Sequence, residues 1–389
     1  MKVSLLTGGN DPPYVLPLLS ALTSRGITVD FIGNDEMQNA EAVRNKNVNY
    51  LNLRGDQRLN APMKEKIFRV IRYYFKLIKY AALTDSKLFH IIWLNKFIHF
   101  DRTFLNLYYK ISGKKLVFTA HNINAEERDE KDSLINRLTL KFMYKNVDHI
   151  FVHTNKMRLQ LIEGFNVSKN KVTVIPFGIN NTTPKSELTS VQAKEKLHLR
   201  SSQKIILFFG QIAAYKGLGY LISALVKLKT KGNDYRLIIA GKIKKGYQAY
   251  WENIDRIIEE HDLESSIMRK IEFIPDEEIE IYFKASDVLI LPYKNIFQSG
   301  VLFLAYNFGL PVIATDVGSL RENIVEGKTG FICKPEDPDD LAEKIDLYFN
   351  SDLYRNLEAN RNELIKYAND KYSWEKIGEQ TYAVYKSLL

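Results

Sequence analysis

The segment from Pro292 to Asp316 (PYKNIFQSGVLFLAYNFGLPVIATD) constrains the fold more than any other part of the chain. It follows an apolar run, Val288 to Leu291, that is typical of a buried strand in a parallel sheet. A polar loop leads to Gln298-Ser299-Gly300, where an apolar helix begins, and Gly309-Leu310-Pro311 ends that helix before a second strand, Val312 to Ala314. A strand, a Ser/Gly turn and a helix start bring free backbone N–H groups and the positive end of a helix dipole together, which favours phosphate binding.

Short apolar runs alternate with helical segments along both halves of the chain, which predicts two successive doubly wound parallel α/β sheets. Two such sheets, each with its own ligand edge, imply a cleft between the domains. We interpret the polar residues 181–203 as a linker between domains at 1–180 and 204–372. The expected strands are residues 3–7, 27–32, 89–94, 115–119, 150–153 and 171–175, then 204–209, 236–240, 271–274, 288–291, 312–314 and 330–333.

The composition excludes several classes of protein. A chain of 389 residues is too long for one ordinary core, and its single cysteine, Cys333, excludes a disulfide framework and fits a reducing compartment. Because Cys333 lies in an apolar run, we expect a buried structural thiol. No apolar stretch is long enough to span a membrane, and the N-terminus lacks the length of a signal peptide. We therefore expect a cytoplasmic protein.

The positive charge is concentrated in the first half. Residues 1–178 carry 27 Lys and Arg against 16 Asp and Glu, a net charge of +11, whereas the remainder carries −2. This asymmetry indicates an anionic partner, and no nucleic-acid-binding motif accompanies it, so a membrane surface is the preferred interpretation. From Lys64 to Ala82 the pattern predicts a two-faced helix, which suits either an anionic membrane or the surface of its own domain. Its expected apolar side holds Ile67, Ile71, Tyr74 and Ile78, and its expected membrane-facing basic side holds Arg69, Arg72, Lys76 and Lys79.

His121 is the candidate for chemistry in the first half. It follows the strand at 115–119 and precedes a polar run from Asn122 to Asp132. Ligands of open parallel sheets bind at the carboxyl ends of the strands, so His121 is well placed to contact one. A lone histidine is more often structural, and its position after a buried strand is what favours the functional interpretation.

Six motifs in order resemble the GT-B retaining glycosyltransferases of family 4, which are built like glycogen synthase. The resemblance extends over essentially the whole chain and is strongest from Val174 to Pro335. It implies two Rossmann-like domains facing across a cleft, with the helix at 374–389 packing back on the first. It also implies a UDP- or GDP-linked sugar donor and neither a cofactor nor a metal. The motifs are VIPFGIN (174–180), FFGQIAAYKG (208–217), IIAG (238–241), FIPDEEI (273–279), the opening segment, and GSLRENIVEGKTGFI (318–332).

The resemblance assigns roles to individual positions. Lys216 matches the lysine that reaches the donor diphosphate, where a cation stabilises the charge that develops on the leaving group. Glu322 matches the acidic residue near the ribose, and Ile274 would lie beside the base. His121 matches the residue that contacts the transferred sugar, and Gly9 the glycine turn beside the donor phosphates. Ordinary roles are the alternatives, a solvated loop charge for Lys216 and a helix-start contact for Glu322.

The sequence departs from the family pattern at three positions. Alignment on Gly309 places Ile296 and Leu304 where the family usually carries two glutamates, and Gln211 stands where it carries an arginine. The chain instead resembles a branch with a QSG turn, in which Gln298, Ser299 and Gly300 contact the sugar and phosphates. Three lysines after the IIAG motif are candidates to replace the arginine: Lys242, Lys244 and Lys245.

The resemblance implies a metal-independent, hexosyltransferase-type enzyme that transfers sugar with retention, using His121 and Lys216. We expect a glycan or lipid-linked acceptor, as in assembly of a bacterial surface polysaccharide or glycolipid, at the inner face of the membrane. No paired carboxylates suggest double displacement. A non-catalytic nucleotide-sugar-binding or regulatory subunit of the same fold is the main alternative. A nucleotide-sugar epimerase is a third, and the sequence shows no acid and base for it.

Overall fold

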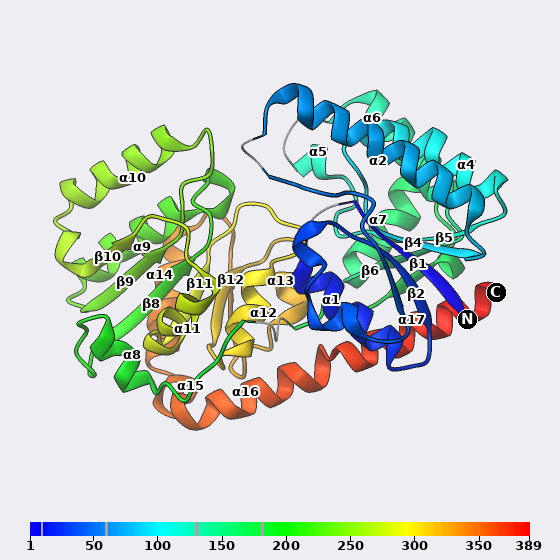
Figure 1. Ribbon diagram of the computed structural model, residues 1–389. Helices are drawn as coiled ribbons and strands as arrows, with labels where there is room; N and C mark the ends of the chain where they lie inside the picture. Colours follow the sequence, from blue (N-terminus) through cyan, green and yellow to red (C-terminus); the bar gives the residue numbers. More distant parts are fainter. Residues whose placement is uncertain (9–10, 59–60, 129–131, 180–182) are drawn as a thin grey trace. The chain divides into compact units, whose positions relative to one another are not determined.

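The computed structural model describes residues 1–8, 11–58, 61–128, 132–179 and 183–389 (Figure 1). The chain forms two compact units. The first comprises Met1–Gly178 and Tyr372–Leu389, and the second comprises Ile179–Lys371. Each unit is a parallel sheet with helices packed on both faces, which confirms the predicted pair of doubly wound domains.

The first unit contains a seven-stranded sheet within the described residues, in the order β3-β2-β1-β4-β5-β6-β7. Its strands are β1 (Lys2–Thr7), β2 (Thr28–Ile32), β3 (Val48–Leu51), β4 (Leu88–Trp93), β5 (Lys115–Thr119), β6 (His149–Val152) and β7 (Val172–Val174). Its helices are α1 (Pro12–Thr23), α2 (Met63–Leu83), α3 (Ile98–Phe100), α4 (Asn106–Ile111), α5 (Ala125–Arg128), α6 (Leu134–Asn146), α7 (Asn155–Phe165) and α17 (Trp374–Leu388). A π-helical turn, Asp101–Leu105, joins α3 to α4.

One core of the first unit lies between the sheet and the pair α1 and α17. Side chains of alternate strand residues, such as Val3, Leu5 and Phe31, pack there against Leu18 of α1 and Ile377 of α17. The C-terminal helix is therefore part of this unit, and it completes the core that the first half of the chain begins.

The second unit contains a six-stranded sheet within the described residues, in the order β10-β9-β8-β11-β12-β13. Its strands are β8 (Lys204–Phe209), β9 (Tyr235–Ala240), β10 (Ile267–Lys270), β11 (Val288–Leu291), β12 (Val312–Thr315) and β13 (Gly330–Cys333). Its helices are α8 (Ser190–Lys196), α9 (Leu218–Thr230), α10 (Gln248–Glu260), α11 (Asp276–Ala285), α12 (Gly300–Asn307), α13 (Leu320–Asn323), α14 (Pro338–Phe349), α15 (Asp352–Arg355) and α16 (Leu357–Lys371).

Two details of the predicted organisation differ from the structure. The strand expected at 271–274 is wrong, because β10 ends at Lys270 and residues 271–275 form a loop. The described part of the expected linker belongs to the second unit. Helix α8 packs on α11, and the Ser186 backbone N–H and hydroxyl donate to the Glu280 carboxylate at 3.0 and 2.7 Å.

The expected apolar side of α2 is divided between the core and the surface. Tyr73, Tyr74, Leu77 and Ala81 face the unit, whereas Ile67 and Ile71, expected on the same side as Tyr74, are exposed. Arg69, expected on an exposed basic side, turns inward. Its guanidinium donates to the Asp56 carbonyl at 2.6 Å and pairs with the Asp56 carboxylate at 3.3 Å. Arg72 and Lys79 are exposed and Lys76 is half-buried.

Candidate functional site

Glycines bring several loops of the second unit together at the carboxyl edge of its sheet. A Cβ on Gly241, which follows β9, would lie 1.9 Å from the carbonyl oxygen of Gly210, which follows β8. A Cβ on Gly217 would lie 1.7 Å from the carbonyl oxygen of Pro292, which follows β11. Both glycines have positive φ (150° and 68°), a conformation that side chains disfavour. The chain therefore depends on glycine to bring the ends of β8, β9 and β11 together.

Lys216 lies at this meeting point. It ends a short 3₁₀ turn before Gly217, and its Nζ donates to the Tyr293 hydroxyl at 2.9 Å while lying 4.0 Å from the centre of that ring. The Tyr293 hydroxyl is 3.4 Å from the Ser299 hydroxyl, and Ser299 directly precedes α12. The predicted diphosphate lysine and the predicted Ser299-Gly300 turn are thus joined through Tyr293, a residue that sequence reasoning did not single out.

A second loop holds the Gln298 side chain. Gly318 has a φ of 56°, and a Cβ there would lie 1.8 Å from the Ile296 carbonyl oxygen. This close approach lets the Ser319 N–H donate to the Phe297 carbonyl at 3.1 Å and the Ser319 hydroxyl donate to Gln298 Oε1. Since its oxygen is engaged, the Gln298 amide presents its NH₂ group as the side that can donate to a ligand.

The other predicted donor residues lie on the same edge or near it. Gln211 is exposed and follows Gly210 directly after β8. Ile274 is buried in the loop after β10, which leaves its backbone for ligand contacts. Glu322 is exposed on α13, in the loop region that follows β12. Gly9 lies outside the described residues.

Lys244 is the best placed of the three lysines that were candidates to replace the missing arginine. The backbone after β9 pairs with the loop after β8, with Ile212 N–H donating to Lys242 O and Lys244 N–H donating to Ile212 O, both at 2.9 Å. This pairing places Lys244 Nζ 4.9 Å from the centre of the Tyr215 ring, which precedes Lys216. Lys242 lies instead over the Phe273 ring, at 5.4 Å.

In the first unit, His121 is buried among aromatic rings at the end of β5. Its ring stacks on Trp93 of β4 at 4.1 Å with an interplanar angle of 9°, and the Tyr14 ring of α1 meets it edge-on at 4.7 Å. His121 Nδ1 is 3.1 Å from Nε2 of His153, whose Nδ1 is 3.3 Å from the Ile175 carbonyl oxygen. Spacing along the sequence gave no signal for this contact between the ends of neighbouring strands.

These contacts determine where the protons lie. A carbonyl oxygen only accepts, so His153 Nδ1 donates to it, and the neutral His153 must accept at Nε2. His121 therefore donates from Nδ1, and its Nε2 carries a lone pair. Burial lowers the pKa of His121 well below its usual value and that of His153 to about 4, so both rings are neutral near pH 7. Among the described residues, none hydrogen-bonds to the buried Nε2 of His121.

The described residues contain neither a metal-binding cluster nor a membrane-spanning helix. No three of their His, Cys, Asp or Glu side chains lie close enough together to hold a metal ion. No helix among these residues combines the length and apolar composition needed to cross a membrane. The exposed basic residues of α2 that were predicted to face a membrane, Arg72 and Lys79, belong to the first unit.

Both halves of the chain match families of known proteins. The Glycosyltransferase Family 4 model matches residues 13–182, and the Glycosyl transferases group 1 model matches residues 191–371. A D-inositol 3-phosphate glycosyltransferase of Corynebacterium urealyticum is 28% identical over 285 residues, which are 70% of this chain and 66% of that protein. The match therefore leaves about a third of that relative's length uncovered.

Solved structures agree with the fold over the whole chain. Sucrose-phosphate synthase from Thermosynechococcus elongatus superposes with a TM-score of 0.77 at 19% identity, covering 100% of this chain and 99% of that one. HepE from Anabaena, solved with UDP and glucose, superposes with a TM-score of 0.74 at 18% identity and covers 100% of both chains. With two family models matched in order and this fold, the chain belongs to the GT-B glycosyltransferases of the family 4 type.

Proposed function

We propose that the protein transfers a sugar from a nucleotide diphosphate donor to a hydroxyl acceptor, with retention at the anomeric carbon. The observation that carries the proposal is the contact of Lys216 Nζ with the Tyr293 hydroxyl beside Ser299 at the start of α12. A cation and the first N–H groups of a helix meet there, and both stabilise a departing diphosphate. The UDP in the HepE structure supports UDP as the nucleotide.

Lys216 serves in this proposal as the cation that reaches the diphosphate. Its Nζ donates to the Tyr293 hydroxyl, and no carboxylate of the described residues pairs with it. Tyr293 is buried and holds the ammonium in place before the donor arrives, so little reorganisation is needed. The backbone N–H groups at Ser299 and Gly300 and the Gln298 amide complete the contacts with the phosphates and the sugar.

His121 has the protonation state of a hydrogen-bond acceptor. Its Nε2 lone pair suits a hydroxyl group of a sugar substrate, which would satisfy a buried nitrogen that otherwise lacks a partner. Because the ring is neutral, it does not supply a proton as a general acid near pH 7. We therefore assign His121 to substrate positioning, and we assign deprotonation of the acceptor hydroxyl to the departing phosphate oxygen. No step of this scheme uses a metal.

We further propose that the first unit docks on an anionic membrane, as expected for synthesis of a surface polysaccharide or glycolipid. Its support is an exposed side of α2 that carries both basic and large apolar side chains. Phe68 and Phe75 are 64% and 70% exposed, and Arg72 and Lys79 are exposed beside them. Aromatic and basic residues on one side of a helix favour the interface of an anionic bilayer.

Turnover tests the transferase proposal. The full chain is incubated with UDP- and GDP-sugars and a lipid extract, and release of the nucleoside diphosphate is measured. Lys216→Met should lower acceptor-dependent release about 100-fold or more, because a cation at the leaving group is lost. Lys227→Met, which removes an exposed lysine on α9, is the matched control and should leave the rate unchanged. Tight nucleotide binding without release under any acceptor would favour the binding-subunit alternative.

Vesicle sedimentation tests the membrane proposal. Binding should increase with phosphatidylglycerol content and fall when Phe68 and Phe75 are both changed to Ser. Leu347→Ser, at an exposed apolar position of α14 in the second unit, is the control and should bind like the unchanged protein. Binding that ignores lipid charge would contradict the proposal.

A further inference from the structure

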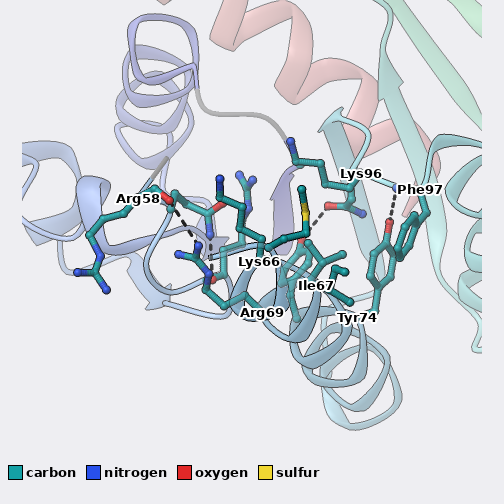
Figure 2. Close-up of a pocket in the computed structure, with 14 residues that line it drawn as sticks. Arg58, Lys66, Ile67, Arg69, Tyr74, Lys96 and Phe97 are labelled. Atoms are coloured by element: carbon teal, nitrogen blue, oxygen red, sulfur yellow. Dashed lines mark hydrogen bonds between the residues drawn. The ribbon is translucent and has the colours of Figure 1, made fainter. Parts of the chain in front are cut away.

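A pocket of about 410 Å³ lies in the first unit at the carboxyl ends of β1 and β4 (Figure 2). Gly8, which follows β1, and Asn95 to Phe97, which follow β4, form one side of it. The start of α2 and the loop at 54–58 form the other. Trp93, the last residue of β4, stacks on His121, so the pocket opens on the same sheet edge as the neutral histidine. This is the edge at which parallel sheets bind ligands.

The lining of the pocket is cationic and includes no acidic residue among the described residues. Its cations are Arg54, Arg58, Lys66, Arg69 and Lys96. Asp56 and Glu65, close to the lining, pair with two of them: Arg58 lies 2.6 Å from Asp56, and Arg69 lies 3.3 Å from Asp56 and 4.0 Å from Glu65.

Lys66 and Lys96 remain available to a ligand. Within the described residues, neither ammonium group has an ion pair or a hydrogen bond. Figure 2 shows their side chains on the pocket, one from α2 and the other from the loop after β4. Two unneutralised ammonium groups on one cavity favour an anion with several oxygens, such as a phosphate.

Hydrogen bonds hold two tyrosine side chains that line the pocket, Tyr73 and Tyr74. The Tyr73 hydroxyl donates to Asn95 Oδ1 at 2.9 Å, and the Tyr74 hydroxyl donates to Asp101 at 2.9 Å while accepting from the Phe97 N–H at 3.0 Å. These bonds fix two aromatic rings before any ligand binds.

Apolar side chains lead from the pocket to the exposed side of α2. Met63 and Ile67 line the pocket and are 70% and 52% exposed, and Phe68 beside them is 64% exposed. A cavity of 410 Å³ accommodates a polar head group, whereas a long hydrocarbon chain must leave it. Exposed apolar side chains at the mouth provide a surface for that chain.

We propose that this pocket binds the acceptor, and that the acceptor is a phosphorylated amphiphile: a phosphate-bearing head group attached to a hydrocarbon chain. The phosphate contacts Lys66 and Lys96, and the chain leaves over Met63 and Ile67. The role of this ligand as the acceptor rests on the proposed transferase function, whereas the binding of the amphiphile to the pocket does not depend on it.

Calorimetry with monomeric probes tests the proposal on the full chain without any sugar donor. The probes are dihexanoyl phosphatidic acid, dihexanoyl phosphatidylcholine and glycerol 3-phosphate, each below its micelle concentration. Phosphatidic acid should bind at least about tenfold more tightly than either of the others, since burying roughly 60 Å² of hydrocarbon suffices for that gain over glycerol 3-phosphate. Equal affinity for phosphatidic acid and glycerol 3-phosphate would overturn the proposal that the ligand is an amphiphile and would leave a site for free phosphates.

Charge variants locate the binding. The double variant Lys66→Gln, Lys96→Gln should lose about tenfold or more in affinity for phosphatidic acid. Lys64→Gln, Lys87→Gln removes the same charge from exposed positions of the first unit outside the pocket and should bind like the unchanged protein. Equal losses of affinity in both double variants would overturn the assignment of binding to this pocket, because affinity would then depend only on the overall charge of the protein.

UDP binding separates this inference from the transferase proposal. The Lys66, Lys96 variant should bind UDP as the unchanged protein does, because both residues lie in the first unit and the proposed diphosphate contacts lie in the second. Failure of the unchanged protein to bind UDP would remove the donor proposal and leave the amphiphile site standing. Failure to bind phosphatidic acid with UDP binding intact would remove the amphiphile site alone.

Discussion

His90 should make the first unit sensitive to acid. It lies in the middle of β4, fully buried, with Nδ1 2.5 Å from the Tyr385 hydroxyl of α17 and Nε2 2.7 Å from the Thr119 hydroxyl of β5. Burial lowers the pKa of His90 to about 3, whereas an unfolded histidine has a pKa of about 6.5. The proton therefore binds the unfolded chain first as the pH falls.

The magnitude follows from these two pKa values. The stability that neutral His90 contributes is fully present above pH 6.5 and is lost as the pH falls from there toward 3. Near pH 5 the unfolded chain binds a proton at His90 and the folded chain does not. This difference lowers the free energy of unfolding by about 2 kcal/mol. Since an ordinary domain has a total stability of about 5–15 kcal/mol, this loss is measurable.

The assay is urea unfolding followed by tryptophan fluorescence at pH 7.5 and pH 5. A Trp251→Phe background limits the signal to the first unit, because the remaining tryptophans, Trp93 and Trp374, both lie there. His90→Gln should reduce the loss of unfolding free energy between the two pH values by about 2 kcal/mol, whatever its effect on stability at pH 7.5. Thr119→Val removes one partner but keeps the buried histidine, so it should retain the full loss. Equal pH dependence in His90→Gln and the unchanged chain would refute the reasoning.

Two further predictions concern the second unit. Gly217→Ala should weaken UDP binding strongly, because its Cβ would lie 1.7 Å from the Pro292 carbonyl oxygen and must displace the loop that carries Lys216. Gly232→Ala, at a φ of 78° with open space around it, is the control. It should lower the free energy of unfolding in urea by only about 1–2 kcal/mol. Lys194→Met should lower the free energy of unfolding by about 3–5 kcal/mol, since it leaves the buried Asp287, 3.2 Å away, without this ion-pair partner. The double variant Lys194→Met, Asp287→Asn should recover part of that loss. An equal loss in the single and double variants would contradict the ion-pair explanation.

The sequence predicted the central strands and the edge strands β7 and β13 well, but it missed the edge strand β3 and misplaced the edge strand β10. Central strands such as β8 and β11 are buried on both faces, so they read as continuous apolar runs. The edge strands β3 and β10 are half-exposed and carry polar residues, among them Arg269, which pairs with Asp255 on the surface at 2.7 Å. That composition hid β3 entirely and shifted the predicted strand from 267–270 to 271–274.

Periodicity located α2 but did not show which of its apolar side chains pack on the unit. The helix carries apolar residues on more than one side, and the pattern of Ile67 and Ile71 was as regular as that of Tyr73 and Leu77. Packing of the tyrosines was decided by their hydroxyl bonds to Asn95 and Asp101, which lie beyond β4 and which no local pattern reveals. The exposure of Ile67 that resulted is what supports an apolar chain at the mouth of the pocket.

The same limit applies to the proposed donor site. Motifs predicted that Lys216, Ser299 and Glu322 follow strand ends, and the structure places them after β8, β11 and β12, because strand ends can be recognised from sequence. Tyr293 and Ser319 were missed, since each acts through a contact with a loop distant in the chain. In both cases the sequence did contain an indirect signal, a glycine next to the loop: Gly217 against Pro292, and Gly318 against Ile296.

The three departures from the family pattern offset one another in charge. Ile296 and Leu304, where the resemblance expects glutamates, are 8% and 7% exposed, so apolar packing has replaced two carboxylates. One expected arginine is also absent at Gln211. Two negative charges and one positive charge are lost together, which makes the site more positive by one unit than the family pattern. In the proposed donor site, a diphosphate beside Lys216 would therefore experience less repulsion, and the loss of the arginine would be offset without a new cation. Lys244, on the neighbouring loop, would add to this effect. Under the proposed function, this balance lets the uncharged donors of the QSG turn bind a nucleotide diphosphate together with Lys216.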